Sequence, residues 1–508
     1  MNACVPDLRA FLALQERSGR LQRVPAEVDK DRELACIARW ALESTRAEDA
    51  YAILFERVRD HRAPVAVNLY TTHALYAAAL GTTPERLLEV WAAALAHPKP
   101  PVPVAFGPVH EVVELGPRAD LRSLPSPVWT PGRDAGPYLS AAAVITKDPD
   151  TGIQNLGTYR VQIHEGRRAG VFFGTGLQHG AMHYAKWRAR NQAMPIAIVV
   201  GAPPVVSFAA AAKTAYGVDE MTIAGGLAGA GIEILQAATV DLMIPAQAEC
   251  VIEGVVEPGA QRQEGPFGEA LGYMNGPAVA PCATVSAITH RRDPIHHGYV
   301  QQLPPSEGHV VWEMGVLGPL WYYLTRQLRL AGIRDLAIAR GSAGVAVLLV
   351  QIAGTHVSRA MTLGRTLAKI NFGQKLIYLL DEDIDIHDLE TVTWAISARV
   401  DPRRDITVID GLKTFQADPS VMARAALTSS GIGAPPYESS LAIVDATLKG
   451  SVPELALPAP ALMQAALDRW PELALPPITP RARLRRLLAG HGEGGARSAG
   501  DHGHQHPG

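Results

Sequence analysis

The stretch EGPFGE, residues 264–269, places two carboxylates five positions apart, separated by two glycines and a proline. Pro266 fixes its own φ, and the glycines beside it allow the backbone to bend sharply. Such a bend can bring Glu264 and Glu269 to one spot, whereas an extended strand would turn them to opposite faces. Paired carboxylates in unlike environments can act as acid and base near neutral pH. The hexapeptide alone favours an ordinary turn with two solvated glutamates, because exposed glutamate is so common.

The composition is that of a globular protein. Of 508 residues, 47% are hydrophobic and 19% are charged, and this length predicts two or three domains. The net charge of −3 offers no positive field for nucleic acid or for an anionic membrane. The four cysteines lie far apart without metal-ligand spacing, which indicates free thiols in a reducing cytosol. The sequence lacks a signal-peptide pattern and a membrane-spanning apolar run, so we expect a cytoplasmic protein.

Changes of pattern along the chain predict five parts. Residues 1–103 have the pattern of a small α/β unit that ends in a proline-rich connector, and residues 104–305 consist mostly of short strands, which favours a barrel or a sandwich. Residues 306–330 form one long predicted helix that links this part to the next. Strands and helices alternate over residues 331–480, which indicates a mixed or parallel sheet. Residues 481–508 have the composition of a disordered tail, whose histidines are candidates only for weak metal binding.

Within the strand-rich part, the pattern predicts strands over residues 138–146 and 155–163, a hairpin turn at 165–167 and a helix over 183–191. If residues 155–163 form one strand, Asn155 and Arg160 have opposite parity. A bulge at Gly157 would then be needed to turn both to one side.

Several polar residues are candidates for chemistry on their type alone. Arg160 is a fixed cation suited to holding a carboxylate, although most arginines are simply exposed. Gln178 and His179 precede a predicted helix, so His179 is a candidate metal ligand or phosphate contact, or a capping or core histidine. Glu220 is one more possible oxygen ligand. The acidic run at residues 381–385 is typical either of a metal loop or of a solvated loop with a helix cap.

Taken together, these motifs resemble the UbiD-like decarboxylases, a family that uses prenylated FMN. The resemblance extends over nearly the whole chain, in the family's order and spacing. It rests on NLGTYR (155–160), Gln-His (178–179), GVDE (217–220), TVDLMIPAQAECVIEG (239–254), EGPFGE with Gly272-Tyr273, and KLIYLLDEDIDIHDLETVTWAISARVDP (375–402).

The resemblance implies a mixed α+β fold. Its parts would be an N-terminal α/β unit, a split β-barrel that binds the flavin, a linker helix and a C-terminal α/β domain. The C-terminal domain would assemble homodimers or higher homo-oligomers. Activity would depend on a flavin prenyltransferase as the supplier of the cofactor.

The resemblance also implies roles by position. Arg160, Glu264 and Glu269 fall on the catalytic positions, where Glu269 would protonate the substrate carbon after CO2 leaves and Glu264 would hold Arg160. The metal positions would bind Mn2+ or Mg2+ next to the cofactor phosphate, with K+ as a further candidate ion. These positions fall on Asn155, His179 and Glu220, and the other cofactor contacts fall on Gly157, Thr158, Gln178 and Lys375.

The substrate is harder to infer from the sequence. Ala270, directly after the expected acid, leaves room for a bulky or polar ring. The other pocket candidates, each of which is equally compatible with a structural role, are His296, His297, Gln302, Gly308, His309 and Trp312.

We therefore expect reversible, non-oxidative decarboxylation of an aromatic or heteroaromatic carboxylic acid. A cinnamate-type acrylic acid is the second candidate substrate. A split-barrel flavoprotein reductase is an alternative enzyme class, although the chain carries no nicotinamide fingerprint. A non-catalytic subunit is a third alternative, but it would be expected to lack Arg160, Glu264 or Glu269, and all three are present.

Overall fold

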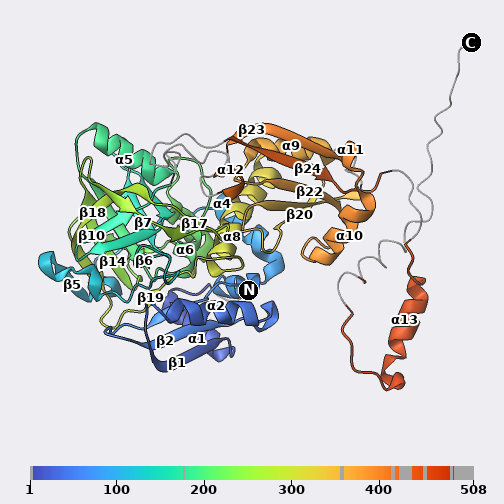
Figure 1. Cartoon of the computed structure of the whole chain (residues 1–508), viewed down its shortest axis with the longest axis horizontal. Coiled ribbons are helices and arrows are strands. Elements are labelled where there is room, and N and C mark those ends of the chain that lie inside the picture. The colour runs from blue at the N-terminus through green and yellow to red at the C-terminus, as the bar shows by residue number, and fades with distance from the viewer. Residues whose placement is uncertain are drawn as a thin grey trace, which may run out of the picture. The chain divides into compact units, whose positions relative to one another are not determined.

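The computed structural model divides the chain into two compact units (Figure 1). One unit holds residues 1–330, 340–346 and 410–440, and the other holds residues 331–339, 347–409 and 441–508. None of the helices described is both long and apolar enough to span a membrane. The structure describes residues 4–174, 178–354, 360–413, 418–422, 438–449, 455–480 and 484, so the predicted tail lies almost entirely outside the described residues.

The N-terminal part of the first unit is a four-stranded sheet in the order β1-β2-β3-β19. Its last strand comes from far along the chain: His296 and His297 pair in parallel with Val65 and Ala66. The strands are β1 (Leu21–Val28), β2 (Ala52–Val58), β3 (Val65–Val67) and β19 (His296–His297). The helices of this part are α1 (Leu8–Arg17), α2 (Leu34–Ser44), α3 (His73–Ala79) and α4 (Leu87–Ala96), with short helical turns η1 (Ala47–Asp49) and η2 (Pro84–Arg86).

A ten-stranded sheet dominates the first unit. Its main path runs β6-β9-β10-β18-β14-β11-β7-β8, and β5 and β15 also pair with the long strand β18. Their bounds are β5 (Val112–Leu115), β6 (Tyr138–Leu139), β7 (Ala143–Lys147), β8 (Gln154–Thr158), β9 (Val161–Glu165), β10 (Arg168–Val171), β11 (Met194–Val200), β14 (Cys250–Val256), β15 (Gln261–Glu264) and β18 (Ala278–His290).

This sheet must curl so strongly that its two ends approach each other. Strands β8 and β9 lie six steps apart in the sheet, which is about 29 Å in a flat sheet at the usual strand spacing. Only Tyr159 and Arg160 separate the two strands along the chain, a span of at most about 11 Å. The segment that connects β6 to β7 also runs from one end of the sheet to the other. It is hydrogen-bonded to the β8–β9 connection, because the Tyr159 N–H donates to the Ala142 carbonyl at 3.4 Å. Arg160 therefore lies at the seam of a barrel-like sheet.

The sequence pattern placed two strands of this sheet and the start of one helix wrongly. Residues 155–163 form two strands rather than one, because the chain leaves β8 at Thr158 and joins β9 across the seam at Val161. No bulge at Gly157 is needed, since the strand ends instead of continuing. The predicted strand 138–146 is split in the same way into β6 and β7, and the helix predicted to begin at residue 183 begins at His179. The hairpin turn at residues 165–167 is confirmed, between β9 and β10.

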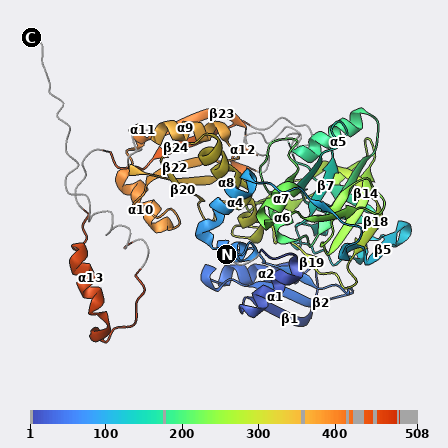
Figure 2. The same cartoon turned by 180° about the vertical axis from the view of Figure 1, so that it is seen from behind.

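Helix α8 follows the strand-rich part, as predicted for residues 306–330, but its regular α-helix spans Glu307–Tyr322 and then widens to a π-helical turn, Tyr323–Gln327. Two glycines let it pack closely: a Cβ on Gly318 would lie 2.5 Å from the Trp91 ring, and one on Gly315 would lie 2.3 Å from the Ala211 carbonyl oxygen. Figure 2 shows α6 and α7 next to each other beside β7. Further elements of this unit are α5 (His179–Ala189), α6 (Pro204–Ala210), α7 (Glu220–Ala228), β4 (Val102–Pro103), β12 (Glu233–Gln236), β13 (Met243–Pro245), β16 (Phe267–Gly268) and β17 (Met274–Asn275).

The second unit holds most of a five-stranded sheet in the order β20-β21-β22-β24-β23. Strands β21, β22 and β24 pair in parallel and β20 is antiparallel, which confirms the predicted mixed sheet. Its strands are β20 (Ile333–Ile338), β21 (Val347–Ile352), β22 (Leu376–Asp381), β23 (Ile406–Lys413) and β24 (Glu438–Asp445). Further α-helices among the described residues are α9 (Ala360–Ile370), α10 (Leu389–Arg399), α11 (Pro402–Asp405), α12 (Pro419–Met422) and α13 (Pro460–Asp468).

One buried carboxylate ties the start of α8 to the N-terminal sheet. Glu307, fully buried, accepts hydrogen bonds from the backbone N–H groups of Asn68 (2.7 Å) and Leu69 (3.1 Å), just beyond β3. Nε2 of His297, in β19, lies 3.0 Å from Oε1 of Glu307. The Glu307 side chain thus provides the hydrogen-bond partner for two backbone N–H groups and one histidine ring, all of which are buried from water.

We expect Glu307→Ala to destabilise the first unit by about 3–5 kcal/mol, because it leaves these buried donors without an acceptor. Urea unfolding followed by tryptophan fluorescence measures the change. Glu48→Ala removes a side chain that is 71% exposed and should stay within about 0.5 kcal/mol of the parent protein. Equal stability of the two variants would contradict this role for Glu307.

Candidate active site

The EGPFGE stretch forms the predicted bend. Strand β15 ends at Glu264, and Gly265 has φ of +79°, a conformation that glycine adopts without strain. The Gly265 N–H is held by the Tyr138 hydroxyl at 3.0 Å and by Oε1 of Gln162 at 3.2 Å. A Cβ at this position would lie 3.0 Å from the Gly276 carbonyl oxygen. The bend is therefore fixed by both conformation and close packing.

The bend brings both glutamates to one guanidinium. Arg160 donates through Nε to Oε1 of Glu264 at 2.9 Å and through Nη2 to Oε2 at 2.6 Å, which is a bidentate pair. Its remaining nitrogen, Nη1, donates to Oε1 of Glu269. The expected pairing of Arg160 with Glu264 is present, and the structure adds a direct contact between Arg160 and Glu269.

The environment of Arg160 is nearly dry. The side chain of Arg160 is 7% exposed and that of Glu264 is fully buried. The guanidinium carbon lies 4.0 Å from the centre of the Phe172 ring and 5.2 Å from that of Phe267. Burial works against the charge of Arg160, but Glu269 and Glu264 outweigh it and raise its pKa above the ordinary value. The cation is thus permanent.

Glu269 is placed to keep a proton more readily than an ordinary glutamate. Burial raises the pKa of its carboxyl group, and the charge of Glu264 acts in the same direction. Arg160 and the Ala270 N–H oppose this shift without cancelling it. The side chain keeps 22% exposure, more than Arg160 or Glu264, so it is the member of the group that a reactant can approach.

The three expected metal ligands also lie together. Nδ1 of His179 is 3.6 Å from Oε1 of Glu220, and each residue is the first of its helix, α5 and α7. Glu220 is also held by the Leu156 N–H at 2.8 Å and by the Thr214 hydroxyl at 2.9 Å. The neighbouring residue of β8, Asn155, is buried, and its amide nitrogen has no hydrogen-bond partner.

These residues fit a hard divalent cation in their chemistry. The distance between the His179 nitrogen and the Glu220 oxygen is short enough for one ion to contact both. The unpartnered amide of Asn155 can turn so that its oxygen faces the same place. Among the described residues, no group of three or more His, Cys, Asp or Glu side chains could hold a metal, so the candidate set depends on Asn155.

The other expected cofactor contacts are placed as follows. Gly157, in β8, has to be glycine because a Cβ would lie 2.5 Å from the Tyr159 ring. Thr158 is the half-buried last residue of β8, and Gln178 directly precedes α5. Lys375 directly precedes β22 in the second unit, so its contact with a cofactor phosphate remains a prediction.

Ala270 and His309, two of the expected pocket residues, contact each other. Nε2 of His309 lies 2.6 Å from the Ala270 carbonyl oxygen, and its Nδ1 lies 2.8 Å from the Ser306 hydroxyl. Burial lowers the pKa of His309 to about 4, so the ring is neutral and donates to Ala270. His309 thus holds the backbone carbonyl of Ala270, one residue after Glu269.

The remaining pocket candidates have internal partners or neighbours. His297 bonds to Glu307, and Nε2 of Gln302 donates to the Trp129 carbonyl at 2.5 Å. A Cβ on Gly308 would lie 2.4 Å from Oε1 of Gln301. Trp312 is half-buried, and Nζ of Lys213 lies 5.9 Å from the centre of its ring. His296 is buried in β19. Their contact with a substrate remains a prediction.

The acidic run at residues 381–385 is a structural ion-pair site. The guanidinium of Arg399 bonds Asp381 at 3.0 Å and Asp383 at 3.0 and 2.6 Å. The Leu448 N–H also donates to Asp381, at 2.6 Å. These contacts occupy Oδ2 of Asp381 and both oxygens of Asp383, which favours the loop interpretation over a metal loop.

Sequence reasoning missed several residues that hold this site. Tyr138 and Gln162 anchor Gly265, Phe172 covers Arg160, and Thr214 holds Glu220. Asp134 accepts from the Gly268 N–H at 3.2 Å. None of these residues lies within a motif, and their contacts join segments that are far apart in the sequence.

Family models match the chain over three consecutive segments. They describe the N-terminal domain (residues 12–95), the Rift-related domain (100–304) and the C-terminal domain (313–434) of 3-octaprenyl-4-hydroxybenzoate carboxy-lyase, UbiD. An uncharacterized protein of Synechocystis sp. is 31% identical over 431 residues, which cover 79% of this chain and 84% of that protein. The chain belongs to the UbiD family of carboxy-lyases.

Solved structures of UbiD-class enzymes agree with this. An evolved dimeric form of HmfF from Pelotomaculum thermopropionicum in complex with prFMN is 30% identical, with a TM-score of 0.77 over 89% of this chain and 97% of that one. The closed form of vanillic acid decarboxylase from Sedimentibacter hydroxybenzoicus is 26% identical, with a TM-score of 0.79 over 93% and 100%. The mixed α+β fold inferred from the family resemblance is therefore confirmed.

Neutral His309 predicts a dependence of stability on pH. Its pKa is about 4 in the folded protein and 6.5 as the ordinary value, so between these values the unfolded chain binds the extra proton. Its contribution to stability is complete above about pH 6.5 and is lost as the pH falls, by about 2 kcal/mol at pH 5.

When the pH is lowered from 7.5 to 5, the parent protein should lose about 2 kcal/mol more of its free energy of unfolding than the His309→Gln variant does. Urea unfolding at both pH values measures it. The exposed His97 provides the control, since His97→Gln should keep the parent's pH dependence. A parent-like pH dependence in His309→Gln would show that this ring is not held neutral.

Proposed function

We propose that this UbiD-family protein uses prenylated FMN to decarboxylate an aromatic or heteroaromatic carboxylic acid, reversibly and without oxidation. The observation that carries the proposal is the buried Arg160 shared by Glu264 and Glu269. Two relatives add support, because the HmfF complex contains prFMN and the Sedimentibacter enzyme decarboxylates vanillic acid. We keep a cinnamate-type acrylic acid as the second substrate class.

The proposed reaction needs an electron sink and a proton. Prenylated FMN, when bound, supplies the sink for the charge that CO2 leaves behind. Glu269 supplies the proton to the substrate carbon, since its raised pKa keeps it protonated more readily than a solvated glutamate. Once Glu269 has given up its proton, its carboxylate is left beside Arg160, which stabilises the new charge.

Glu264 acts on Arg160 rather than on the substrate. It is fully buried and holds two of the guanidinium nitrogens, so the third nitrogen is directed at Glu269. Its negative charge also raises the pKa of Glu269. One carboxylate therefore positions the cation and the other transfers the proton.

For the metal, we infer that Asn155, His179 and Glu220 hold Mn2+ or Mg2+ next to the cofactor phosphate. Support comes from the 3.6 Å approach of His179 to Glu220 and from the unpartnered buried amide of Asn155. The ion would neutralise part of the negative charge of the cofactor phosphate. Gly157, Thr158, Gln178 and Lys375 would contact the cofactor, and K+ is a further candidate ion.

The remaining proposals follow from the family. The protein would work in the cytoplasm as a homodimer or a higher homo-oligomer and would receive its cofactor from a flavin prenyltransferase. The pocket would bind the acid near Ala270, with its other residues drawn from His297, Gln302, Gly308, His309 and Trp312.

Glu269→Gln should lower the rate of CO2 release at least about 100-fold, because glutamine has no proton to give. The protein is expressed together with a flavin prenyltransferase, and release is measured with a panel of aryl, heteroaryl and acrylic acids. Exchange of the ring proton for solvent deuterium should fall in parallel. Parent activity should decline as the pH rises through the raised pKa of Glu269, since deprotonation removes the donor.

The matched control is Glu257→Gln, an exposed glutamate at the end of β14, which should keep full activity. Unfolding of each variant is monitored by circular dichroism. Full activity of Glu269→Gln, or of protein stripped of flavin and metal, would reject the proposal.

Glu220→Gln should lower bound manganese at least about tenfold, because a neutral amide is a weaker ligand than a carboxylate. Mass spectrometry gives the metal per subunit and absorbance gives the flavin retained, so the test does not depend on turnover. Glu233→Gln, an exposed residue of β12, is the control. Unchanged metal content in Glu220→Gln would exclude this site.

A further inference from the structure

A small cavity lies beside the candidate metal ligands. Its volume is about 10 Å³, roughly the space of one water molecule, and Asn155 and His179 both line it. Tyr216, Gly217 and Val218 line it as well, and they belong to the loop between α6 and α7. Tyr216 is 40% exposed, so this loop borders both the cavity and the solvent.

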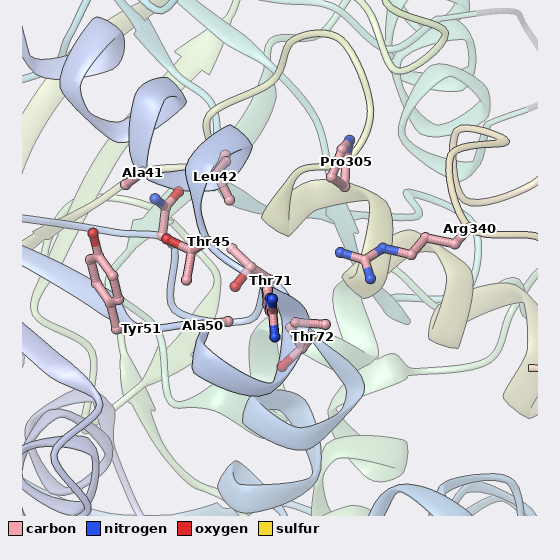
Figure 3. A pocket seen from close by; sticks show the side chains of 12 residues that line it. Ala41, Leu42, Thr45, Ala50, Tyr51, Thr71, Thr72, Pro305 and Arg340 are labelled. Carbon is pink, nitrogen blue, oxygen red and sulfur yellow. The ribbon is translucent and has the colours of Figure 1, made fainter. Parts of the chain in front are cut away.

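The pocket in Figure 3, between the end of α2 and Arg340, has no such link to the proposed chemistry. Its volume is about 20 Å³, which is again room for roughly one water molecule. The described residues that line it include none of the candidate catalytic residues or metal ligands. The cavity beside Asn155 and His179 is therefore the one to consider further.

Tyr216 is connected to all three segments that carry the candidate metal ligands. The edge of one ring meets the face of the other where Tyr216 packs on His179 of α5, with the ring centres 5.4 Å apart and the planes at 89°. The Tyr216 hydroxyl donates to Oδ2 of Asp148 at 2.5 Å, where the chain turns from β7 into β8, the strand of Asn155. Tyr216 itself precedes Glu220 by four residues.

Helix α5 supports this arrangement through a lysine. Asp148 is 2% exposed, and Nζ of Lys186 lies 2.7 Å from its Oδ2. The same Nζ lies 5.1 Å from the centre of the Tyr216 ring. Tyr216, Asp148 and Lys186 thus contact one another in a closed group of three.

A second histidine of α5 packs on the same tyrosine. The rings of His183 and Tyr216 have their centres 5.8 Å apart and their planes at 75°. Nδ1 of His183 lies 2.9 Å from the Thr146 hydroxyl, and Thr146 of β7 is paired with Asn155 of β8. Tyr216 is therefore held from both α5 and the β7–β8 hairpin.

The His179 ring depends on this contact for its orientation. A histidine that binds a metal is usually oriented by a hydrogen bond from its other ring nitrogen. Within the described part of the chain, the polar neighbour of the His179 ring is Glu220 at 3.6 Å, which is too long for a hydrogen bond. The packing of Tyr216 against the ring limits its rotation instead.

We propose that Tyr216 is a positioning residue of the metal site. Its ring sets the orientation of His179. Its hydroxyl, through Asp148, ties the chain that leads to Glu220 to the hairpin that carries Asn155. Tyr216 does not bind the ion itself. This inference rests on the proposed metal site, and the experiment below separates failure of the one from failure of the other.

The test is a titration of the metal-stripped, full-length protein with Mn2+ in the presence of FMN. Electron paramagnetic resonance measures the free ion, so the result does not depend on turnover. Tyr216→Phe keeps the ring and removes the hydroxyl, and it should raise the Kd for Mn2+ about threefold. Tyr216→Ala removes both and should raise the Kd at least about tenfold.

A double variant tests the link through Asp148. Asp148→Ala should raise the Kd for Mn2+ at least as much as Tyr216→Phe does. The combination of Asp148→Ala with Tyr216→Phe should bind Mn2+ no more weakly than Asp148→Ala alone, because both changes remove the same hydrogen bond. A double variant whose effect is the product of the two single effects would contradict this link.

The matched control is Tyr323, which is 37% exposed in the same unit. Tyr323→Phe and Tyr323→Ala should keep the parent's Kd for Mn2+. Urea unfolding of the metal-free variants is the second measurement. A merely structural Tyr216 would lower the urea midpoint in Tyr216→Ala and leave the Kd unchanged, and that result would overturn the proposal.

Glu220→Gln is the reference variant. If Glu220→Gln loses Mn2+ and Tyr216→Ala binds it like the parent, the positioning role is wrong and the metal site stands. If Glu220→Gln binds Mn2+ like the parent, the metal site itself is wrong and the positioning role fails with it.

Discussion

One guanidinium held between two carboxylates is the interaction on which the site depends. Burying a guanidinium and a carboxylate is expensive unless each has hydrogen-bond partners, and here Arg160 and Glu264 provide them for each other as a bidentate pair. Arg160 can occupy this position because it lies where the chain crosses the seam of the curled sheet. Glu264 and Glu269 reach it because Gly265 turns the chain between them. The chemistry of the site therefore depends on the closure of the sheet.

The candidate catalytic residues could be chosen from the sequence through the family resemblance, because their motifs are short and their order is specific. Their geometry could not. Residues 155–163 have an unbroken strand pattern, and nothing in that pattern shows that the chain changes partner strands after Thr158. The residues that support the bend, Tyr138 and Gln162, come from strands that only the folded sheet brings near Gly265. Long-range pairing, rather than local preference, decides these contacts.

The contacts of the histidines near the expected pocket could not be predicted from the sequence either. The sequence suggested that His297 and His309 face a substrate, since histidine is a versatile donor. In the structure, His297 meets the buried Glu307, and His309 bridges Ser306 and the Ala270 carbonyl. Both rings have internal partners, so they organise the backbone around Glu269 and α8. A buried histidine needs partners for both nitrogens, and the nearest groups often supply them.

Strand β19 also has a consequence for synthesis on the ribosome. It completes the N-terminal sheet, yet residues 296–297 are made about 230 positions after β3. At 5–20 residues per second, the nascent chain carries an incomplete sheet for roughly 10–50 s. During that time the outer edge of β3 presents unpaired backbone groups, which are a template for pairing with other chains. The first unit thus emerges with an exposed sheet edge that stays open until its own distant strand arrives.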